Sequence, residues 1–223
     1  MTAVLFGSIG TLADTSEMQR ESFNEAFQQH GLDWNWSRDE YRELLRDSGG
    51  AQRIEAYARQ RGEDVDAAAV HRTKSEIFQR KLAEDAPGPR DGVADAVAAA
   101  KGDGFKVALV TTTSRANLEA LATGVKPGLD LGDFDLVVDK SEVDAPKPDG
   151  AVYEYAISQL GEDPSACVAI ENNLDGVSAA KAAGIAVVAY PGVDNADHGF
   201  DDADEKVESL SFGELRGLVG GAS

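Results

Sequence analysis

The chain has 223 residues, of which 42% are apolar, and this length suits one large α/β domain with a modest insertion. No segment is apolar over the length needed to cross a bilayer, which excludes a membrane partner and a membrane-spanning fold. Forty acidic against 21 basic side chains give a formal charge of −19. This overall negative charge repels polyanions, so nucleic acids are excluded as partners.

The first predicted elements are one strand and then a block of helices. Residues 2–6 form a short apolar run that leads into a glycine-bearing loop, which indicates a buried strand. From about residue 16 to residue 84, apolar residues recur at helical spacing. No basic region followed by an apolar segment precedes the first strand, so we expect a cytoplasmic protein.

After the Pro-Gly-Pro at 87–89, predicted helices and strands alternate. The strands are expected at 106–110, 136–138, 166–170 and 186–189. Such alternation builds a doubly wound parallel sheet, with functional residues at the carboxyl ends of the strands. The sequence therefore predicts an α/β core formed by residues 1–14 and 87–223, with residues 15–86 inserted as an all-helical cap over the strand ends.

Several residues are expected to have no role in chemistry. The single cysteine, Cys167, lies in an apolar run that reads as a core strand. The three histidines, His30, His71 and His198, show no metal-ligand spacing and are expected at the surface. The acidic segment 194–205 is expected to be a mobile surface loop.

The acidic residues are spread along the chain, which indicates a solvated acidic surface and adaptation to high salt. At low ionic strength these charges repel one another, whereas in molar salt the Debye length is about 3 Å and the repulsion is screened. We therefore expect a higher Tm in molar potassium chloride than in dilute buffer. Equal melting temperatures in the two solutions would contradict this prediction.

Four of the predicted strand ends carry motifs whose order and spacing resemble those of the haloacid dehalogenase (HAD) superfamily. They are residues 7–12 (Gly-Ser-Ile-Gly-Thr-Leu), Thr111, residues 147–149 (Lys-Pro-Asp) and residues 171–173 (Glu-Asn-Asn). In the helical block, Gly49-Gly50 and Arg53 are similar to the branch that contains β-phosphoglucomutase and the phosphatases of xylulose-1,5-bisphosphate. The resemblance covers essentially the whole chain and implies a phosphoryl-transfer fold.

The resemblance also implies a reaction whose main residues this chain lacks. In the family, one aspartate of the first motif attacks phosphorus, a second protonates the leaving oxygen, and Mg²⁺ is held by the first carboxylate and by acids of the fourth motif. Here Gly7 and Ile9 replace the two aspartates, and Asn172 replaces a fourth-motif aspartate. Only Glu171 clearly remains, and with Lys147 it gives a net charge of zero. We therefore expect no intact catalytic residue and no metal cofactor.

The part of the site that would hold an anion survives. The resemblance implies phosphate binding by Thr111, Thr112 and Lys147, with backbone amides at the start of the following helix. The alternative is that Lys147 simply pairs with Glu171 and fills space. Arg20 and Arg53 match cap positions that contact sugar phosphate in the family, the alternative being solvated surface arginines.

Two further candidate sites are disfavoured by local geometry. Ser8 lies beside the nucleophile position, but strand alternation should turn it to the other side. Trp34 and Trp36 could stack on a ligand, although aromatic residues in a helical cap more often pack its small core.

Three functions remain open from the sequence, the third of which is a purely structural role. The first is a HAD-like protein that has lost phosphatase chemistry and binds a small phosphorylated metabolite, such as a sugar phosphate, or a protein partner. The second is an active or weakly active sugar-phosphate phosphatase or phosphomutase that uses Mg²⁺ and non-standard residues. Loss of both first-motif aspartates favours the first, because such losses usually remove orders of magnitude in rate.

Overall fold

The computed structural model describes residues 2–7, 9–46 and 49–218. Strands from both ends of the chain pair in parallel into one sheet, in the order β3-β2-β1-β4-β5-β6. The predicted doubly wound α/β fold is therefore confirmed. The strands are β1 (Ala3–Phe6), β2 (Lys106–Val110), β3 (Leu136–Val138), β4 (Cys167–Glu171), β5 (Ala186–Ala189) and β6 (Glu205–Lys206).

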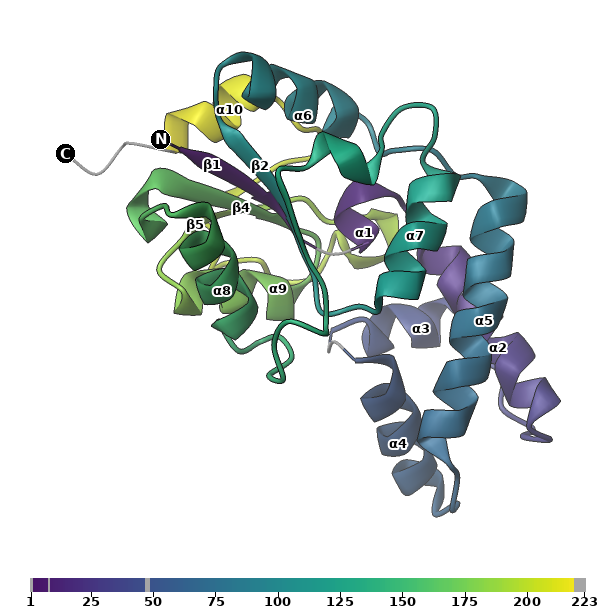
Figure 1. Ribbon diagram of the computed structural model, residues 1–223. Helices are drawn as coiled ribbons and strands as arrows, with labels where there is room; N and C mark the ends of the chain where they lie inside the picture. The colour runs from purple at the N-terminus through teal and green to yellow at the C-terminus, as the bar shows by residue number, and fades with distance from the viewer. Residues whose placement is uncertain (1, 8, 47–48, 219–223) are drawn as a thin grey trace.

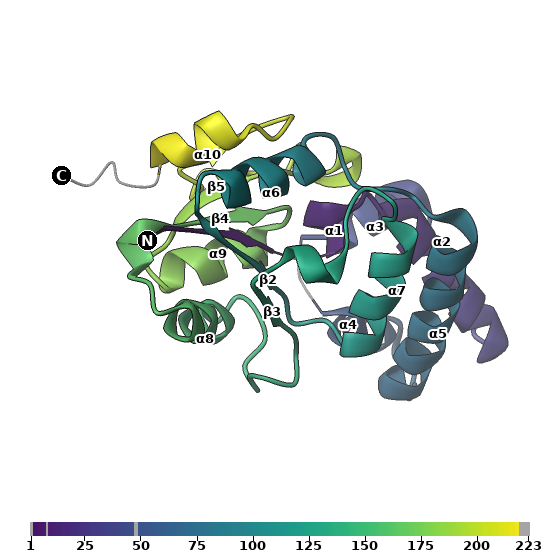
Figure 2. The ribbon, with the colours of Figure 1, turned by 45° about the horizontal axis from the view of Figure 1, so that its top comes forward.

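Helices cover both faces of this sheet (Figure 2). On one face, α6 (Val93–Gly102) and α10 (Phe212–Leu218) pack with α7 (Arg115–Gly124) over a large apolar cluster. On the other face, α8 (Ala151–Leu160) and α9 (Leu174–Ala182) enclose a second cluster that contains Cys167, as predicted for a core cysteine. Both faces are buried because parallel strands are joined by crossover helices. The short helix α1 (Ile9–Leu12) follows β1 directly.

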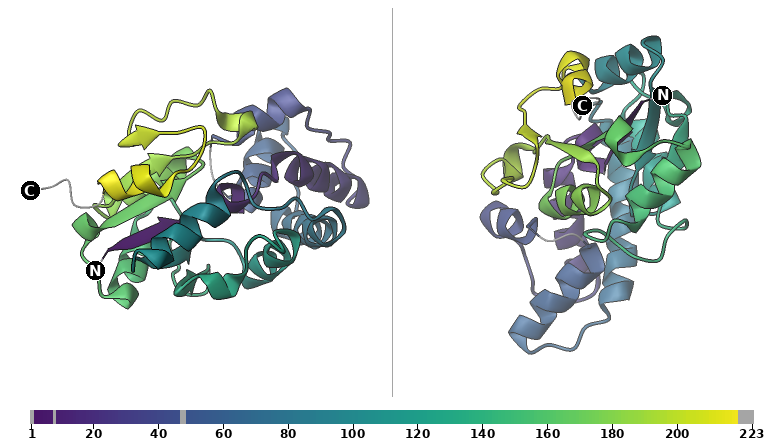
Figure 3. Two further views of the ribbon diagram at one scale, coloured as in Figure 1. Left: turned by 90° about the horizontal axis from the view of Figure 1, so that it is seen from above. Right: turned by 90° about the vertical axis from the view of Figure 1, so that its left-hand side faces the viewer.

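Four helices lie beyond the carboxyl ends of the strands and form a separate lobe (Figures 1 and 3). They enclose their own apolar cluster, and the C-terminal half of the longest one also packs into the sheet domain through Phe78 and Leu82. The proposed boundaries at residues 14/15 and 86/87 stay a prediction. The helices are α2 (Ser16–Gln29), α3 (Arg38–Leu44), α4 (Gly50–Arg61) and α5 (Ala67–Asp85).

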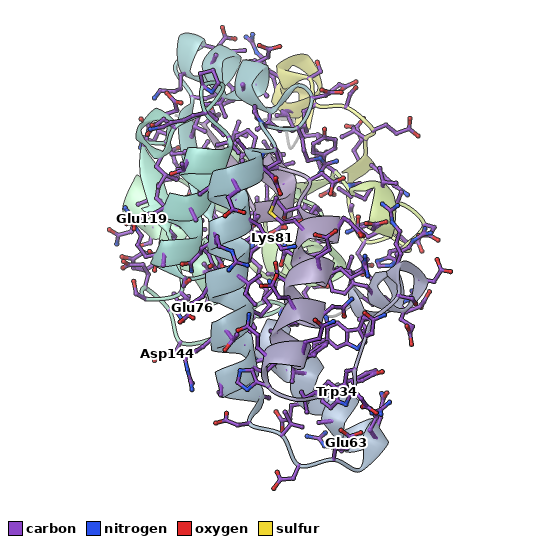
Figure 4. The ribbon with its side chains drawn as sticks, turned by 90° about the vertical axis from the view of Figure 1, so that its right-hand side faces the viewer. Trp34, Glu63, Glu76, Lys81, Glu119 and Asp144 are labelled. Carbon is purple, nitrogen blue, oxygen red and sulfur yellow. The ribbon has the colours of Figure 1, made fainter. Side chains whose placement is uncertain are left out.

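Aromatic side chains form the interior of this helical lobe. Trp34 and Trp36 are 2% and 0% exposed, and both contact the ring of Phe27, which confirms that they pack the cap core. At the tip of the lobe, Trp34 Nε1 donates to Glu63 Oε2 at 2.9 Å (Figure 4). The indole N–H is therefore satisfied internally, as a buried tryptophan requires.

The helical lobe is also attached to the segment that follows β5 (Figure 3). Arg38 Nε lies 3.1 Å from Asp194 Oδ1, and Arg42 Nη2 lies 3.2 Å from Asp197 Oδ1. Asp194 and His198 are buried beneath this contact. The prediction of a surface His198 is therefore wrong, because α3 covers this part of the segment. Residues 196, 197, 199, 201, 202 and 204 are exposed, so the segment as a whole lies at the surface as predicted, and its mobility stays a prediction.

In the part of the chain that the structure describes, no helix is both long enough and apolar enough to cross a membrane.

Candidate functional site

The motif positions meet at the carboxyl edge of the sheet because the strands that carry them are neighbours. In the ladder, Phe6 of β1 pairs with Leu109 of β2 and with Ile170 of β4. Gly7 continues the pairing, since its N–H donates to Ile170 O at 2.8 Å. Thr111 directly follows β2, and Glu171 is the last residue of β4. This register places the ends of three strands side by side.

A buried ion pair occupies the centre of this edge. Lys147 Nζ pairs with Glu171 Oε1 and also donates to Val110 O at 3.0 Å. Lys147 is 6% exposed and Glu171 is 0% exposed. The pairing that the sequence left open as an alternative is therefore present, whereas phosphate binding by Lys147 stays a prediction.

Tyr153 completes the surroundings of this carboxylate. Its hydroxyl donates to Glu171 Oε1 at 2.6 Å. Burial, together with the negative charge of Glu171, raises the pKa of the Tyr153 phenol well above its usual range. The phenol therefore stays protonated and acts as a permanent donor to the carboxylate.

The two first-motif positions contribute no polar side chain. Gly7 has none, and Ile9 is 7% exposed and belongs to the apolar cluster under α6. Isoleucine at position 9 therefore packs as a core residue, and neither position can attack phosphorus or protonate a leaving group. Ser8 lies outside the described residues.

The donor set at this edge does not fit the Mg²⁺ that the family uses. Mg²⁺ requires near-octahedral oxygen ligands, usually with carboxylate charge. Here Glu171 Oε1 is already taken by an ammonium and a phenol, and Asn172 is a neutral amide whose Oδ1 accepts from Asn173 Nδ2 at 3.2 Å. Among the described residues no three His, Cys, Asp or Glu side chains are grouped as metal ligands. No chemical step is therefore derived through a metal.

The predicted phosphate-binding threonines lie on the loop between β2 and α7. Thr111 is buried, and its Oγ1 accepts from the N–H of Thr113 at 3.1 Å, so the hydroxyl stabilises its own loop. Thr112 is half-buried on the same loop. Anion binding by these residues stays a prediction.

Both predicted cap arginines support the cap itself. Arg20 Nη1 donates to Trp36 O at 2.8 Å, and the same guanidinium pairs with Glu17. Arg53 Nε donates to Leu44 O at 2.7 Å, and its guanidinium lies over the ring of Tyr41 at 5.7 Å. Their contact with a substrate stays a prediction.

Sequence reasoning missed Lys74, which is buried in the cap. It is 4% exposed, its Nζ donates to Gln19 Oε1 at 2.9 Å, and it lies 4.7 Å from the ring centroids of Phe23 and Phe78. Burial, with a smaller effect of the positive charge of Arg53, lowers its pKa to about 7. The available signal was its position four residues after Val70, on the apolar face of α5.

Positive charges from the cap and from the sheet domain converge near His71. Burial, with smaller effects of the positive charges of Lys74, Lys140 and Arg53, lowers the pKa of His71 to about 4. Lys140 belongs to the sheet domain, where its N–H donates to Thr113 O at 3.0 Å. His71 is thus half-buried rather than at the surface as predicted, because it faces this basic region between the two lobes.

A parallel α/β sheet, a helical lobe over its carboxyl edge and four motifs at its strand ends define the class of capped α/β hydrolase folds. The model of the haloacid dehalogenase-like hydrolase family matches residues 1–184, and the chain therefore belongs to this family. This confirms the resemblance predicted from the sequence.

Several similar proteins within this family carry the name CbbY. The chain is 40% identical over 223 residues to Protein CbbY of Cereibacter sphaeroides, covering 98% of this chain and 95% of that protein. A crystal structure of a mutant CbbY from Rhodobacter sphaeroides, in complex with xylulose-1,5-bisphosphate, matches with 39% identity and a TM-score of 0.87 over 98% of this chain and 99% of that one. CbbY from the same organism in complex with phosphate matches with 39% identity and a TM-score of 0.86 over 96% of both chains.

Proposed function

We propose that this chain binds a sugar phosphate between its cap and the carboxyl edge of its sheet, and that it does not transfer the phosphoryl group. The observation that carries the proposal is the state of the motif residues. Gly7 and Ile9 supply no carboxylate, and Glu171 is committed to Lys147.

The chemistry of the motif residues disfavours turnover. Phosphoryl transfer in this family needs a nucleophile, a proton donor for the leaving oxygen and a metal that neutralises charge. The positions that would supply the first two carry no polar side-chain atom, and the remaining donors do not fit Mg²⁺. Losing groups of this kind lowers rates by orders of magnitude rather than changing specificity.

The distribution of charge favours binding of an anion. The chain carries a net charge of −19, yet Arg53, Lys74 and Lys140 lie close enough together to lower the pKa of His71. Such a basic region in an acidic protein favours an anionic ligand. A mutant of a relative that matches over 98% of this chain has been crystallised with xylulose-1,5-bisphosphate, which supports a sugar phosphate as that anion.

The test is a phosphatase screen with a parallel binding measurement. Wild-type protein in molar potassium chloride with Mg²⁺ is expected to release no phosphate from xylulose-1,5-bisphosphate, while this compound raises the Tm. Lys74→Met is expected to reduce the Tm shift, because the substitution removes one of the converging cations. The triple revertant Gly7→Asp, Ile9→Asp, Asn172→Asp tests whether the carboxylates alone restore turnover.

Robust turnover by the wild type would overturn the proposal in favour of an active phosphatase or phosphomutase. Absence of a Tm shift with any sugar phosphate would remove the metabolite and leave a protein partner. The dispersed acidity supports the additional proposal that the protein works in the cytoplasm at high salt.

A further inference from the structure

The Glu171 carboxylate lies where a side chain at position 7 would begin. A Cβ built on Gly7 would be 2.3 Å from Glu171 Cδ, and 2.4 and 2.5 Å from the two carboxylate oxygens. A Cβ built on Gly176 would be 2.2 Å from the same Cδ. Carbon atoms that are not bonded cannot approach so closely. The carboxylate is therefore clamped between two glycines, and it fits only because both lack a side chain.

The same carboxylate serves as the counter-ion of Lys147. Lys147 Nζ pairs with Oε1 and donates to Val110 O, and Tyr153 donates to the same Oε1. Among the described residues, Glu171 Oε2 has no hydrogen-bond partner. A fully buried ammonium needs a counter-ion, and here Glu171 of the same chain supplies it to Lys147.

We propose that Glu171 is an internal ligand of the Lys147 subsite: its carboxylate fills the space left by the missing side chain at position 7 and keeps phosphate away from Lys147. Glycine at position 7 is then more than the loss of a nucleophile. It is the condition that lets Glu171 turn in and neutralise the lysine. Glu171 thereby becomes a specificity-determining residue. It blocks the phosphate position beside Lys147 at the sheet edge and leaves the position beside the cap cations open.

This inference rests on the proposed function and sharpens it. With Lys147 neutralised, the phosphoryl group of a ligand has to be held by the basic region formed by Arg53, Lys74 and Lys140. A ligand with one phosphate is then sufficient. A second phosphate on the ligand would add little affinity, since Lys147 at the sheet edge is already paired with the Glu171 carboxylate.

The first test measures binding of inorganic phosphate by thermal shift. We expect no Lys147-dependent shift in the wild type. In Glu171→Ala the lysine is released, and phosphate at roughly a hundred times its Kd should raise the Tm by several degrees. The part of this shift that exceeds the wild-type shift should vanish in Glu171→Ala/Lys147→Met, which retains the cap cations. A wild-type shift that Lys147→Met abolishes would overturn the proposal.

The second test needs no phosphate and remains informative if the Glu171→Ala variant does not fold. Gly7→Ala in the wild-type background should lower the Tm strongly, because the new methyl group collides with the carboxylate. Gly102→Ala is the matched control, because a Cβ at Gly102, the last residue of α6, would have no neighbour within 4 Å. If Gly7→Ala is as harmless as Gly102→Ala, Glu171 does not occupy this space and the proposal is wrong.

Where Glu171→Ala folds, the two tests join in a double-mutant cycle. The Tm loss caused by Gly7→Ala should largely disappear in the Glu171→Ala background, since contacting residues are not additive. An unchanged loss in both backgrounds would contradict the inference. Failure of these tests leaves the binding of xylulose-1,5-bisphosphate and its dependence on Lys74 untouched, so the two proposals can fail separately.

Discussion

Lys147→Met is expected to lower the free energy of unfolding by about 3–5 kcal/mol, since it leaves a fully buried carboxylate without its counter-ion. Glu171 is 0% exposed, and after the substitution its charge would face only the phenol of Tyr153. Methionine fills nearly the same volume as lysine, so lost packing contributes little. Urea unfolding at neutral pH and high salt measures the effect.

Two further variants identify the cause of this loss. Lys147→Met/Glu171→Gln removes both charges and should be more stable than Lys147→Met alone, because no unpaired charge remains buried. Lys81→Met removes the lysine of a partly exposed pair with Glu21, 2.7 Å long, and should cost less than about 1 kcal/mol. A loss of that small size for Lys147→Met would show that the pair at the sheet edge is not buried.

Lys74→Met is expected to stabilise the protein at pH 6 and to remove a rise in stability between pH 7 and pH 10. The folded chain releases the Lys74 proton at a pKa of about 7, whereas the unfolded chain holds it up to its ordinary value of 10.5. In this window the unfolded state binds more protons, so raising the pH favours the folded state. Below pH 7 the folded state must carry a buried charge, and this costs a few kcal/mol at most.

The groups facing Lys74 set the size of this effect. The rings of Phe23 and Phe78 and the amide oxygen of Gln19 attract the ammonium, whereas Arg53 repels it. Comparing the unfolding free energies of wild type and Lys74→Met at pH 6 and pH 9 isolates this lysine from other titrations. Lys101→Met, which removes an exposed ammonium bonded to Asp133 O, should leave the pH dependence unchanged. The same pH slope in wild type and Lys74→Met would refute the prediction.

The regular part of the fold was predictable because its signals are local. Each strand expected from an apolar run is present to within a residue or two, and the helices between them follow from their spacing. The strand β6 was missed because two residues are too short to show a period, and the helix α10, which buries Leu215, was missed as well. The contact of Arg38 with Asp194 was equally invisible, since it joins residues 156 positions apart.

The sequence by itself determined which atoms the site lacks. Glycine at position 7 and isoleucine at position 9 offer neither a nucleophile nor a proton donor in any conformation, because their side chains contain no such group. The family followed from the order and spacing of the surviving motifs.

Only the tertiary structure decided what replaces the missing groups. Parallel pairing of β1 with β4 brings Glu171 against Gly7, and the loop before α8 brings Lys147 to the same carboxylate. Burial of that pair and of Lys74 depends on packing between distant segments, and it is burial that turns ordinary charged residues into strongly coupled ones. The loss of the first-motif carboxylates is thus visible in the sequence alone. The neutralisation of Lys147 by Glu171 at the sheet edge, in contrast, arises from the fold.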